Sequence, residues 1–161
     1  MLYGFTGSRD GYEPRARLTM DHAGNLYGTT TYGGAMGHGT VFRLVPPASG
    51  GVPWKETILH SFQPTSDGVA PMAGLSWGKN GALYGTTAFS GNPERGCGMV
   101  YSLTPSQGLG TWTETVLYNF KGSSSDGCTP EANIIVAPDG TLYSTTSGGF
   151  DNSGTIFDLA P

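Results

Sequence analysis

The sequence has few charged residues, and its segments without glycine or proline are too short for a fold built of helices. Charged residues make up 12% of the 161 positions, against roughly 25% in an average soluble protein. Because 27 glycines and 11 prolines are spread along the chain, the longest segment without either runs only from Thr111 to Lys121. Average helices are about 11–12 residues long, so an all-α fold is excluded.

Other absences narrow the function. No apolar run approaches the roughly 18–20 residues that span a bilayer, and residues 1–14 have neither a basic start nor an apolar segment. We therefore expect no membrane span, and no signal peptide is visible. The formal net charge is −4 without any cluster of lysine or arginine, which argues against nucleic acid as a partner. With 37% hydrophobic residues, the chain still carries enough apolar material for a buried core.

What the sequence does contain is one unit in three versions. Each version opens with Leu-x-x-Phe and continues with Asp-Gly-x-x-Pro and Leu-Tyr-(Gly/Ser)-Thr-Thr. A glycine-rich loop and Gly-(Thr/Met)-(Val/Ile)-(Phe/Tyr) follow. The versions begin at Leu2, Leu59 and Leu117, which predicts a single repeat domain, 1–161, with repeats at approximately 2–58, 59–116 and 117–161.

Each unit is predicted to be a four-stranded antiparallel meander. Short alternating segments are bounded by Gly, Pro, Asn or Asp, and tight hairpin turns are expected at 21–24, 78–81 and 138–140. Four-stranded sheets repeated at this spacing are typical of β-propeller blades, because adjacent copies cover each other's apolar faces. A parallel solenoid is the alternative, but its rungs are shorter and lack three hairpin turns per period. We therefore expect an all-β fold of β-propeller blades.

The two ends of the repeat pattern are complementary. The third unit has no fourth strand, and Leu2–Phe5 matches the end of a fourth strand with no blade before it. Closed propellers have about four to eight blades, so three cannot close. We expect Leu2–Phe5 to complete the last blade, either of its own chain or of a partner. The expected partner is a second copy joined head to tail, in a six-bladed ring or, without closure, a filament.

Several residues recur at one place in the units and are interpreted as structural. The aspartates cap their own turns, with calcium binding as the alternative, although no dense acidic loop supports it. The tyrosines and tryptophans fill the space between blades, with sugar stacking as the alternative for the tryptophans. These residues are Asp10, Asp67, Asp126, Tyr27, Tyr84, Tyr143, Trp54 and Trp112.

No catalytic or metal-binding pattern accompanies them. The three histidines occupy different places in the repeat and have no metal-ligand spacing, and no Gly-x-Ser-x-Gly motif occurs. We expect no catalytic residue, no metal and no cofactor.

The copies differ most in the loop between their second and third strands, where specific recognition is expected. This loop and the Asp-Gly-x-x-Pro connection should share one rim, which would gather polar and aromatic residues suited to a saccharide. The candidate ligand-binding residues on this rim are Arg9, Tyr12, Glu13, His38, Glu94, Arg95, Glu131 and Asp151.

The two cysteines are expected on the same rim. Cys97 lies in the glycine-rich loop of the second unit, and Cys128 lies in the connection that enters the third. Loops of adjoining blades would bring their Cα atoms to roughly the 4.4–6.8 Å that a disulfide requires. We predict a Cys97–Cys128 disulfide, which is typical of an oxidising exterior.

Leu-Tyr-Gly-Thr-Thr, the following Gly-Gly loop, Gly-Thr-Val-Phe-x-Leu and Ser-Asp-Gly-x-x-Pro occur here in fixed order. This combination resembles the GloVer tandem repeats of bacterial exported and surface-anchored proteins, over nearly the whole chain. The resemblance implies a repetitive exterior protein and brings no established catalytic residues. With neither a leader nor a C-terminal anchor in view, the chain is similar to an excised or short member.

These inferences predict a non-enzymatic β-propeller module, extracellular or at the cell surface, that self-assembles and acts as a structural or binding protein. A saccharide is the candidate ligand. The alternative is a fragment of a carbohydrate-active enzyme, a glycoside hydrolase or polysaccharide lyase. Such an enzyme needs two acids roughly 5–9.5 Å apart, and the sequence shows no paired acidic motif.

Overall fold

The computed structural model describes residues 1–48, 53–91, 96–106, 110–122, 126–149 and 153–160. The fold is all-β, as the sequence predicts, with every paired strand antiparallel to its neighbour. The single helical element in these ranges is the 3₁₀ turn η1 (Lys79–Gly81). No helix in the described ranges has the length and apolar character to cross a bilayer.

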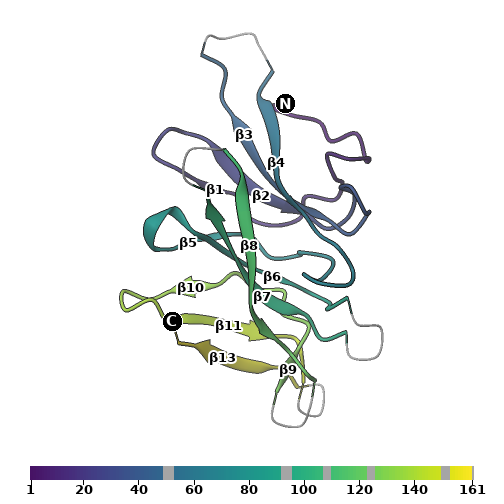
Figure 1. Ribbon diagram of the computed structural model, residues 1–161, viewed down its shortest axis with the longest axis vertical. Helices are drawn as coiled ribbons and strands as arrows, with labels where there is room; N and C mark the ends of the chain where they lie inside the picture. Colours follow the sequence, from purple (N-terminus) through teal and green to yellow (C-terminus); the bar gives the residue numbers. More distant parts are fainter. Residues whose placement is uncertain (49–52, 92–95, 107–109, 123–125, 150–152, 161) are drawn as a thin grey trace.

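The first two units each form a four-stranded meander (Figure 1). The first sheet has the strand order β1-β2-β3-β4, and the second has the order β5-β6-β7-β8. The strands of the first sheet are β1 (Thr19–Met20), β2 (Leu26–Thr30), β3 (Thr40–Val45) and β4 (Lys55–Ser61). Those of the second are β5 (Ser76–Trp77), β6 (Leu83–Thr87), β7 (Met99–Pro105) and β8 (Trp112–Asn119).

The third unit has no fourth strand of its own within the described residues, as the repeat pattern predicts. Within the described residues, its main sheet has three: β10 (Ile135–Val136), β11 (Leu142–Thr146) and β13 (Thr155–Leu159). A separate two-stranded ladder joins β9 (Gly127–Cys128) to β12 (Gly148–Gly149). In the first two units, single bridges take the place of this ladder, between Tyr12 and Tyr32 and between Val69 and Phe89.

The glycine of Leu-Tyr-Gly-Thr-Thr leaves room for neighbouring side chains to pack directly against the backbone of the strand. A Cβ atom on Gly28 would lie 2.6 Å from Leu18 Cδ2 and 2.7 Å from Phe42 Cζ. A Cβ atom on Gly85, the same position in the second unit, would collide with the hydroxyl of Tyr101. In the first two units the position therefore has no room for a side chain, because an aromatic ring of the adjacent strand lies directly over it.

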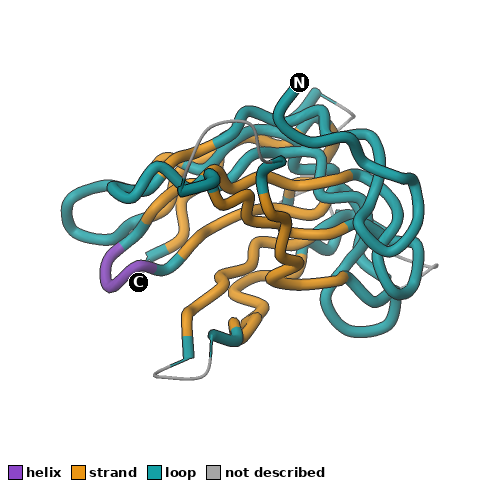
Figure 2. The backbone as a smooth tube through the Cα atoms, turned by 90° about the horizontal axis from the view of Figure 1, so that it is seen from above, coloured by secondary structure: helices purple, strands orange, loops and turns teal. Residues whose placement is uncertain are grey.

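The three main sheets are stacked along the long axis of the molecule (Figures 1 and 2). The turns after β1, β5 and β10 lie along one edge of the stack, opposite the Asp-Gly-x-x-Pro connections. One core lies between the first and second sheets and comprises Tyr27, Val41, Leu59, Phe62, Leu75, Leu83, Tyr101 and Leu103. The other lies between the second and third sheets and comprises Val100, Phe120, Ile134 and Leu142.

The N-terminal segment Leu2–Phe5 is not a strand and does not pair with the third sheet, so the expectation that it completes the last sheet of its own chain is wrong. Instead, Phe5 packs edge-on against Phe42 of the first sheet, with ring centroids 5.1 Å apart. The physical reason is the repeat itself, because the equivalent pairs Phe62–Tyr101 and Phe120–Phe157 are 5.1 and 5.0 Å apart.

Candidate functional site

Each unit has one aspartate at the start of its Asp-Gly-x-x-Pro connection. The loop that precedes the aspartate donates hydrogen bonds to its carboxylate. A backbone N–H of that loop donates to the aspartate in every unit. The donors are Thr6 N to Asp10 at 2.7 Å, Gln63 N to Asp67 at 2.8 Å, and Lys121 N to Asp126 at 2.7 Å.

A ring side chain from the start of the unit also binds each aspartate. His60 Nε2 lies 2.5 Å from Asp67 Oδ2, and Tyr118 is hydrogen-bonded to Asp126. Burial opposes ionisation of Asp67, yet the hydrogen bonds from His60 and Gln63 hold the pKa of its carboxyl below the usual range. These carboxylates therefore order their own loops. No group of three or more His, Cys, Asp or Glu side chains suited to a metal occurs in the described part of the chain.

A second acid, missed by the sequence analysis, approaches this cluster in the first two units. Tyr3 Oη lies 3.2 Å from Asp10 Oδ2 and 3.2 Å from Glu56 Oε2. Burial, with the charge of Asp10, raises the pKa of Glu56 to about 7 although the Tyr3 hydrogen bond opposes the shift. Burial also raises the pKa of Glu114, the equivalent residue of the second unit. The signal in the sequence was the segment Trp-x-Glu-Thr, which occurs at Trp54 and again at Trp112.

Asp10 and Glu56 have pKa values shifted in opposite directions, a pattern that glycosidases use for acid–base pairs. The second unit indicates whether the opposite pKa shifts of Asp10 and Glu56 reflect catalysis or the repeat. Asp67 and His60 form the same kind of cluster next to Glu114, with side chains only 5% and 17% exposed. Because the arrangement recurs in the closed interior between two sheets, we interpret it as part of the repeat architecture.

The rim expected to bind a ligand carries a pair of exposed aromatic rings. Tyr12 and Tyr32 are stacked with centroids 5.2 Å apart and an interplanar angle of 28°, and both are exposed. Glu13, beside Tyr12, forms an ion pair with Arg15 at 2.7 Å. Phe89, at the position of Tyr32 in the second unit, is also exposed. The rim thus offers aromatic faces in two adjoining units.

The other predicted rim residues are spread over the units. Arg9 is exposed, and the carbonyl of His38 accepts the N–H of Ala70 at 3.0 Å, across the boundary between the first and second units. In the third unit, Ser147 Oγ donates to Glu131 at 3.2 Å. Of the predicted rim residues, Tyr12 and Glu13 are consecutive in the first unit, whereas Glu131 lies in the third unit. Glu94, Arg95 and Asp151 lie outside the described residues.

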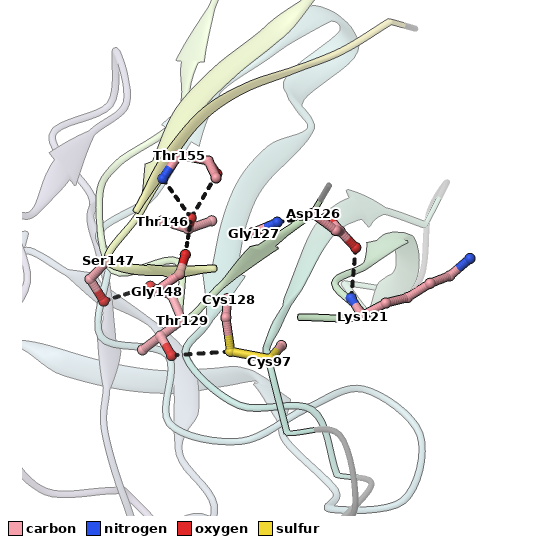
Figure 3. Close-up of a disulfide and its surroundings, with 10 residues drawn as sticks. All are labelled: Cys97, Lys121, Asp126, Gly127, Cys128, Thr129, Thr146, Ser147, Gly148 and Thr155. Carbon is pink, nitrogen blue, oxygen red and sulfur yellow. Dashed lines mark hydrogen bonds between the residues drawn. A yellow bond between two sulfur atoms is a disulfide. The ribbon is translucent and has the colours of Figure 1, made fainter. Parts of the chain in front are cut away.

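The predicted disulfide is confirmed (Figure 3). Cys97 and Cys128 are bonded with their Cα atoms 4.2 Å apart, and they join the loop of the second unit to the ladder of the third. Thr129 N also donates to the carbonyl of Cys97 at 2.8 Å. The corresponding bond one unit earlier is Ala70 N to His38 O, so the disulfide reinforces a contact that each unit boundary repeats.

The recurrent tyrosines and tryptophans lie at the boundaries between sheets. Tyr27 of the first sheet contacts Trp77 and Trp112 of the second, with ring centroids 4.9 and 6.3 Å apart. Tyr84 of the second sheet packs against the core shared with the third. Tyr143, on the outer face of the third sheet, is exposed, and Trp54 directly precedes β4.

A polar cavity that the sequence analysis missed lies among β1, β5 and the residues that lead into β1, β5 and β10. Gly74 N donates to Asn133 Oδ1 at 2.8 Å, and Trp77 Nε1 donates to the carbonyl of Met20 at 3.1 Å, which holds these strands together. No recurrent residue signalled the cavity. It has a volume of about 190 Å³ and is lined by Arg17, Leu18, Thr19, Leu75, Ser76, Trp77 and Asn133.

The outer face of the third sheet exposes residue types that are buried between the sheets. Ile156 of β13 is 85% exposed, whereas Val41 and Val100, its equivalents in the first two sheets, are 0% exposed. Tyr143 is 41% exposed, whereas Tyr27 is 4% exposed. β11 alternates between buried and exposed residues and β13 between half-buried and exposed ones, as expected for a sheet covered on one face only.

The outer face of the first sheet shows the same contrast. Leu18 is 43% exposed, whereas its equivalents Leu75 and Ile134 are 3% and 2% exposed. An open apolar groove of about 270 Å³ lies on this face. Its lining is Leu2, Tyr3, Phe5, Pro14, Ala16, Leu18, Leu26, Phe42 and Leu44.

The fold and these recurrent clusters define a tandem-repeat all-β protein in which stacked antiparallel sheets are joined by Asp-Gly-x-x-Pro connections. The model of the Gloeobacter/Verrucomicrobia repeat family matches residues 1–157, and the chain belongs to this family. The resemblance to GloVer-type repeats is therefore confirmed. A search of curated proteins finds no match.

Proposed function

We propose that this protein is a non-enzymatic, extracellular module of β-propeller blades that self-assembles head to tail and serves as a surface structural and binding protein. The observation that carries the proposal is the exposure of Ile156 and Leu18 at positions that are buried at both internal sheet boundaries. In the proposed contact, the outer face of the third sheet, which carries Ile156, packs against the outer face of the first sheet of the next copy, which carries Leu18.

The stacking supports the propeller assignment. Two four-stranded antiparallel sheets and a three-stranded one follow one another face to face, and each adjoining pair encloses a core. Propeller rings have about four to eight blades, so two chains of three blades would form a six-bladed ring. If the rotation between copies does not close, the same contact builds a filament.

Burial of apolar surface provides the driving force. Leu2, Leu18, Met20, Tyr143 and Ile156 are exposed on the two outer faces. Complete burial of one such side chain contributes about 1.5–3 kcal/mol before the costs of association are subtracted. The five side chains are already partly buried in the single chain, so docking adds the burial of their exposed parts, and this term favours association of two copies. The Cys97–Cys128 disulfide supports an exterior location, because such bonds persist in oxidising compartments.

Analytical ultracentrifugation of the dilute protein tests the proposal. We expect a mass of two chains for a ring or a continuous series for a filament. Ile156→Asp should shift the distribution to the single chain, because it places a charge in the contact. Met36→Asp is the matched control, since Met36 is exposed on the loop between β2 and β3 and not on a sheet. A monodisperse single chain for the unaltered protein would overturn the proposal.

Saccharide binding at the rim is the second candidate function, favoured by the stacked pair Tyr12–Tyr32 and by exposed Phe89. Flat aromatic faces next to polar groups suit sugar rings, which are apolar on one face and polar at the edge. A glycan array should show binding that Tyr12→Ala abolishes and Tyr12→Phe retains, because phenylalanine preserves the ring. Equal binding by all three proteins would rule out this rim as the site.

A further inference from the structure

We infer that the second copy docks in the register already used by adjoining sheets within one chain, which places Tyr12 beside the partner's Ser153. This inference rests on the proposed self-assembly and specifies which atoms the two copies bring together. Adjoining sheets within the chain are joined by three kinds of contact: a backbone hydrogen bond at a strand edge, a loop contact at the rim and a packed apolar face. The first sheet and the third sheet each present one half of all three contacts on their outer sides.

The first element is a strand edge. Phe62 N donates to Gly39 O at 3.0 Å, and Phe120 N donates to Gly98 O at 3.0 Å. Each bond joins the end of a unit's fourth strand to the glycine that begins the third strand. The equivalents at the ends of the chain are Phe5 and Gly154. Docking in register therefore directs Phe5 N to the partner's Gly154 O.

The second element is the loop contact at the rim. Ala70 N donates to His38 O at 3.0 Å, and Thr129 N donates to Cys97 O at 2.8 Å. The corresponding donor at the next boundary is Glu13 N, and its acceptor is the partner's Ser153 O. The disulfide Cys97–Cys128 spans this contact in the chain, with Cα atoms 4.2 Å apart. Its equivalents across the copies are Tyr12 and the partner's Ser153.

The third element is the packed face. Val41 lies in a core formed with Leu59, Phe62, Leu75, Leu83, Tyr101 and Leu103 of the next unit. Their counterparts in the first unit line the open groove of about 270 Å³: Leu2, Phe5, Leu18, Leu26, Phe42 and Leu44. Since Ile156 has the position of Val41, the register seats the partner's Ile156 in this groove.

Tyr143 completes the match on the face. Tyr27 packs edge-on against Trp77 and Trp112 of the next unit. The counterparts of these tryptophans in the first unit are Met20 and Trp54. Docking therefore places the partner's Tyr143 against Met20, which is 58% exposed in the single chain, and against Trp54.

Cysteine cross-linking between copies tests the register. One protein carries Tyr12→Cys and the other carries Ser153→Cys, and the two are mixed under mild oxidation. We expect a disulfide-linked heterodimer to form at least about a hundredfold faster than with His22→Cys in place of Tyr12→Cys, because docking raises the effective thiol concentration. His22 is exposed on the turn after β1, at the opposite edge of the stack. The intrachain pair His38→Cys and Val69→Cys is the positive control for the geometry.

A second cysteine pair avoids dependence on the rim. Gly4→Cys with Thr155→Cys matches the directly opposed pair Ser61 and Thr40. A Cβ atom on Gly4 would meet only Met1, at 3.8 Å and beyond, so the substitution fits the fold. We expect this pair to cross-link between copies as well.

The outcomes separate the inference from the function on which it rests. Oligomers by mass without cross-linking of either pair would overturn the register and leave self-assembly standing. Homodimers of the Tyr12→Cys protein that form as fast as the expected heterodimer would also overturn the register, because that rate requires an isologous contact. A single chain at every concentration would overturn both. Heterodimers of both pairs, with none from His22→Cys, would establish the register.

Discussion

Cys97 and Cys128 link the second unit to the third across 31 positions of the sequence. In the chain-entropy description, closing a loop of this length stabilises the folded state by about 3–4 kcal/mol. We expect the double variant Cys97→Ser/Cys128→Ser to lose about this amount of unfolding free energy while keeping its strands. Equilibrium urea unfolding measures the loss, and far-ultraviolet circular dichroism checks the strands. An unchanged unfolding midpoint would contradict this account.

Gly68 begins the connection into the second unit, and its lack of a side chain is essential. A Cβ atom there would collide with Thr87 Oγ1, and the φ angle is +85°. Gly37 has nearly the same φ angle, +82°, but open space around it. We expect Gly37→Ala to cost about 1–2 kcal/mol from backbone strain alone, and Gly68→Ala to cost about 1–3 kcal/mol more from overpacking. Equal losses in urea unfolding would show that the collision is relieved.

The stability of the protein should fall as the pH rises through the titration of Glu56. Its carboxyl has a pKa of about 7 in the folded chain and an ordinary value of 4.5. A group that holds its proton more tightly when folded stabilises the protein below its unfolded pKa. That contribution disappears as the pH rises through the folded pKa.

Urea unfolding between about pH 4.5 and 7.5 measures this slope, which we expect Glu56→Gln to reduce. A residual slope of the same sign should remain, because the pKa of Glu114 is also raised. Asp139→Asn is the control: hydrogen bonding by Thr141 lowers the pKa of Asp139, so this group titrates below the window. A Glu56→Gln protein with the full slope would show that another group causes it.

The threonine that ends Leu-Tyr-Gly-Thr-Thr has a partner in the first unit and none in the second. Thr30 Oγ1 and Thr40 Oγ1 are 2.8 Å apart in the first unit. In the second unit, Met99 replaces the partner, and Thr87 Oγ1 is buried with no hydrogen bond among the described atoms. We expect Thr30→Val to cost about 1–3 kcal/mol, because a buried hydroxyl loses its partner.

The same substitution in the second unit should behave differently. Thr87→Val removes a buried hydroxyl that already lacks a partner, so it should leave the unfolding free energy unchanged or raise it. Urea unfolding of the two variants side by side gives the comparison. Similar losses would indicate that packing around the methyl groups, and not the hydroxyl, dominates at both sites.

The local features of the repeat were predictable because they depend on neighbouring residues. The short alternating segments bounded by turn residues indicated strands, and β8 (Trp112–Asn119) alternates between half-buried and exposed residues. The disulfide was predictable as well, since the repeat assigns Cys97 and Cys128 to loops on one rim of adjoining units.

Contacts between distant parts of the chain were not predictable. Tyr3 and Glu56 are 53 positions apart, and nothing in either segment indicates that they share a hydrogen bond. The polar cavity around Trp77 and Asn133 was missed for the same reason: its polar side chains Arg17, Trp77 and Asn133 come from three units that carry different residues at the matching places. Among the rim residues, the stacking of Tyr12 on Tyr32 depends on a bridge that forms only when the connection folds back onto the strand.

The sequence by itself determined the repeating unit, its strands and turns, and the pairing of the cysteines, because turn chemistry and side-chain alternation act over a few residues and recur in each unit. Only the tertiary structure decided which sheet faces are covered. Val41 and Ile156 have the same place in the unit, but a sheet is stacked on Val41 and none of the described residues covers Ile156. Burial is a property of the neighbour as well as of the residue, so the local pattern could not distinguish them.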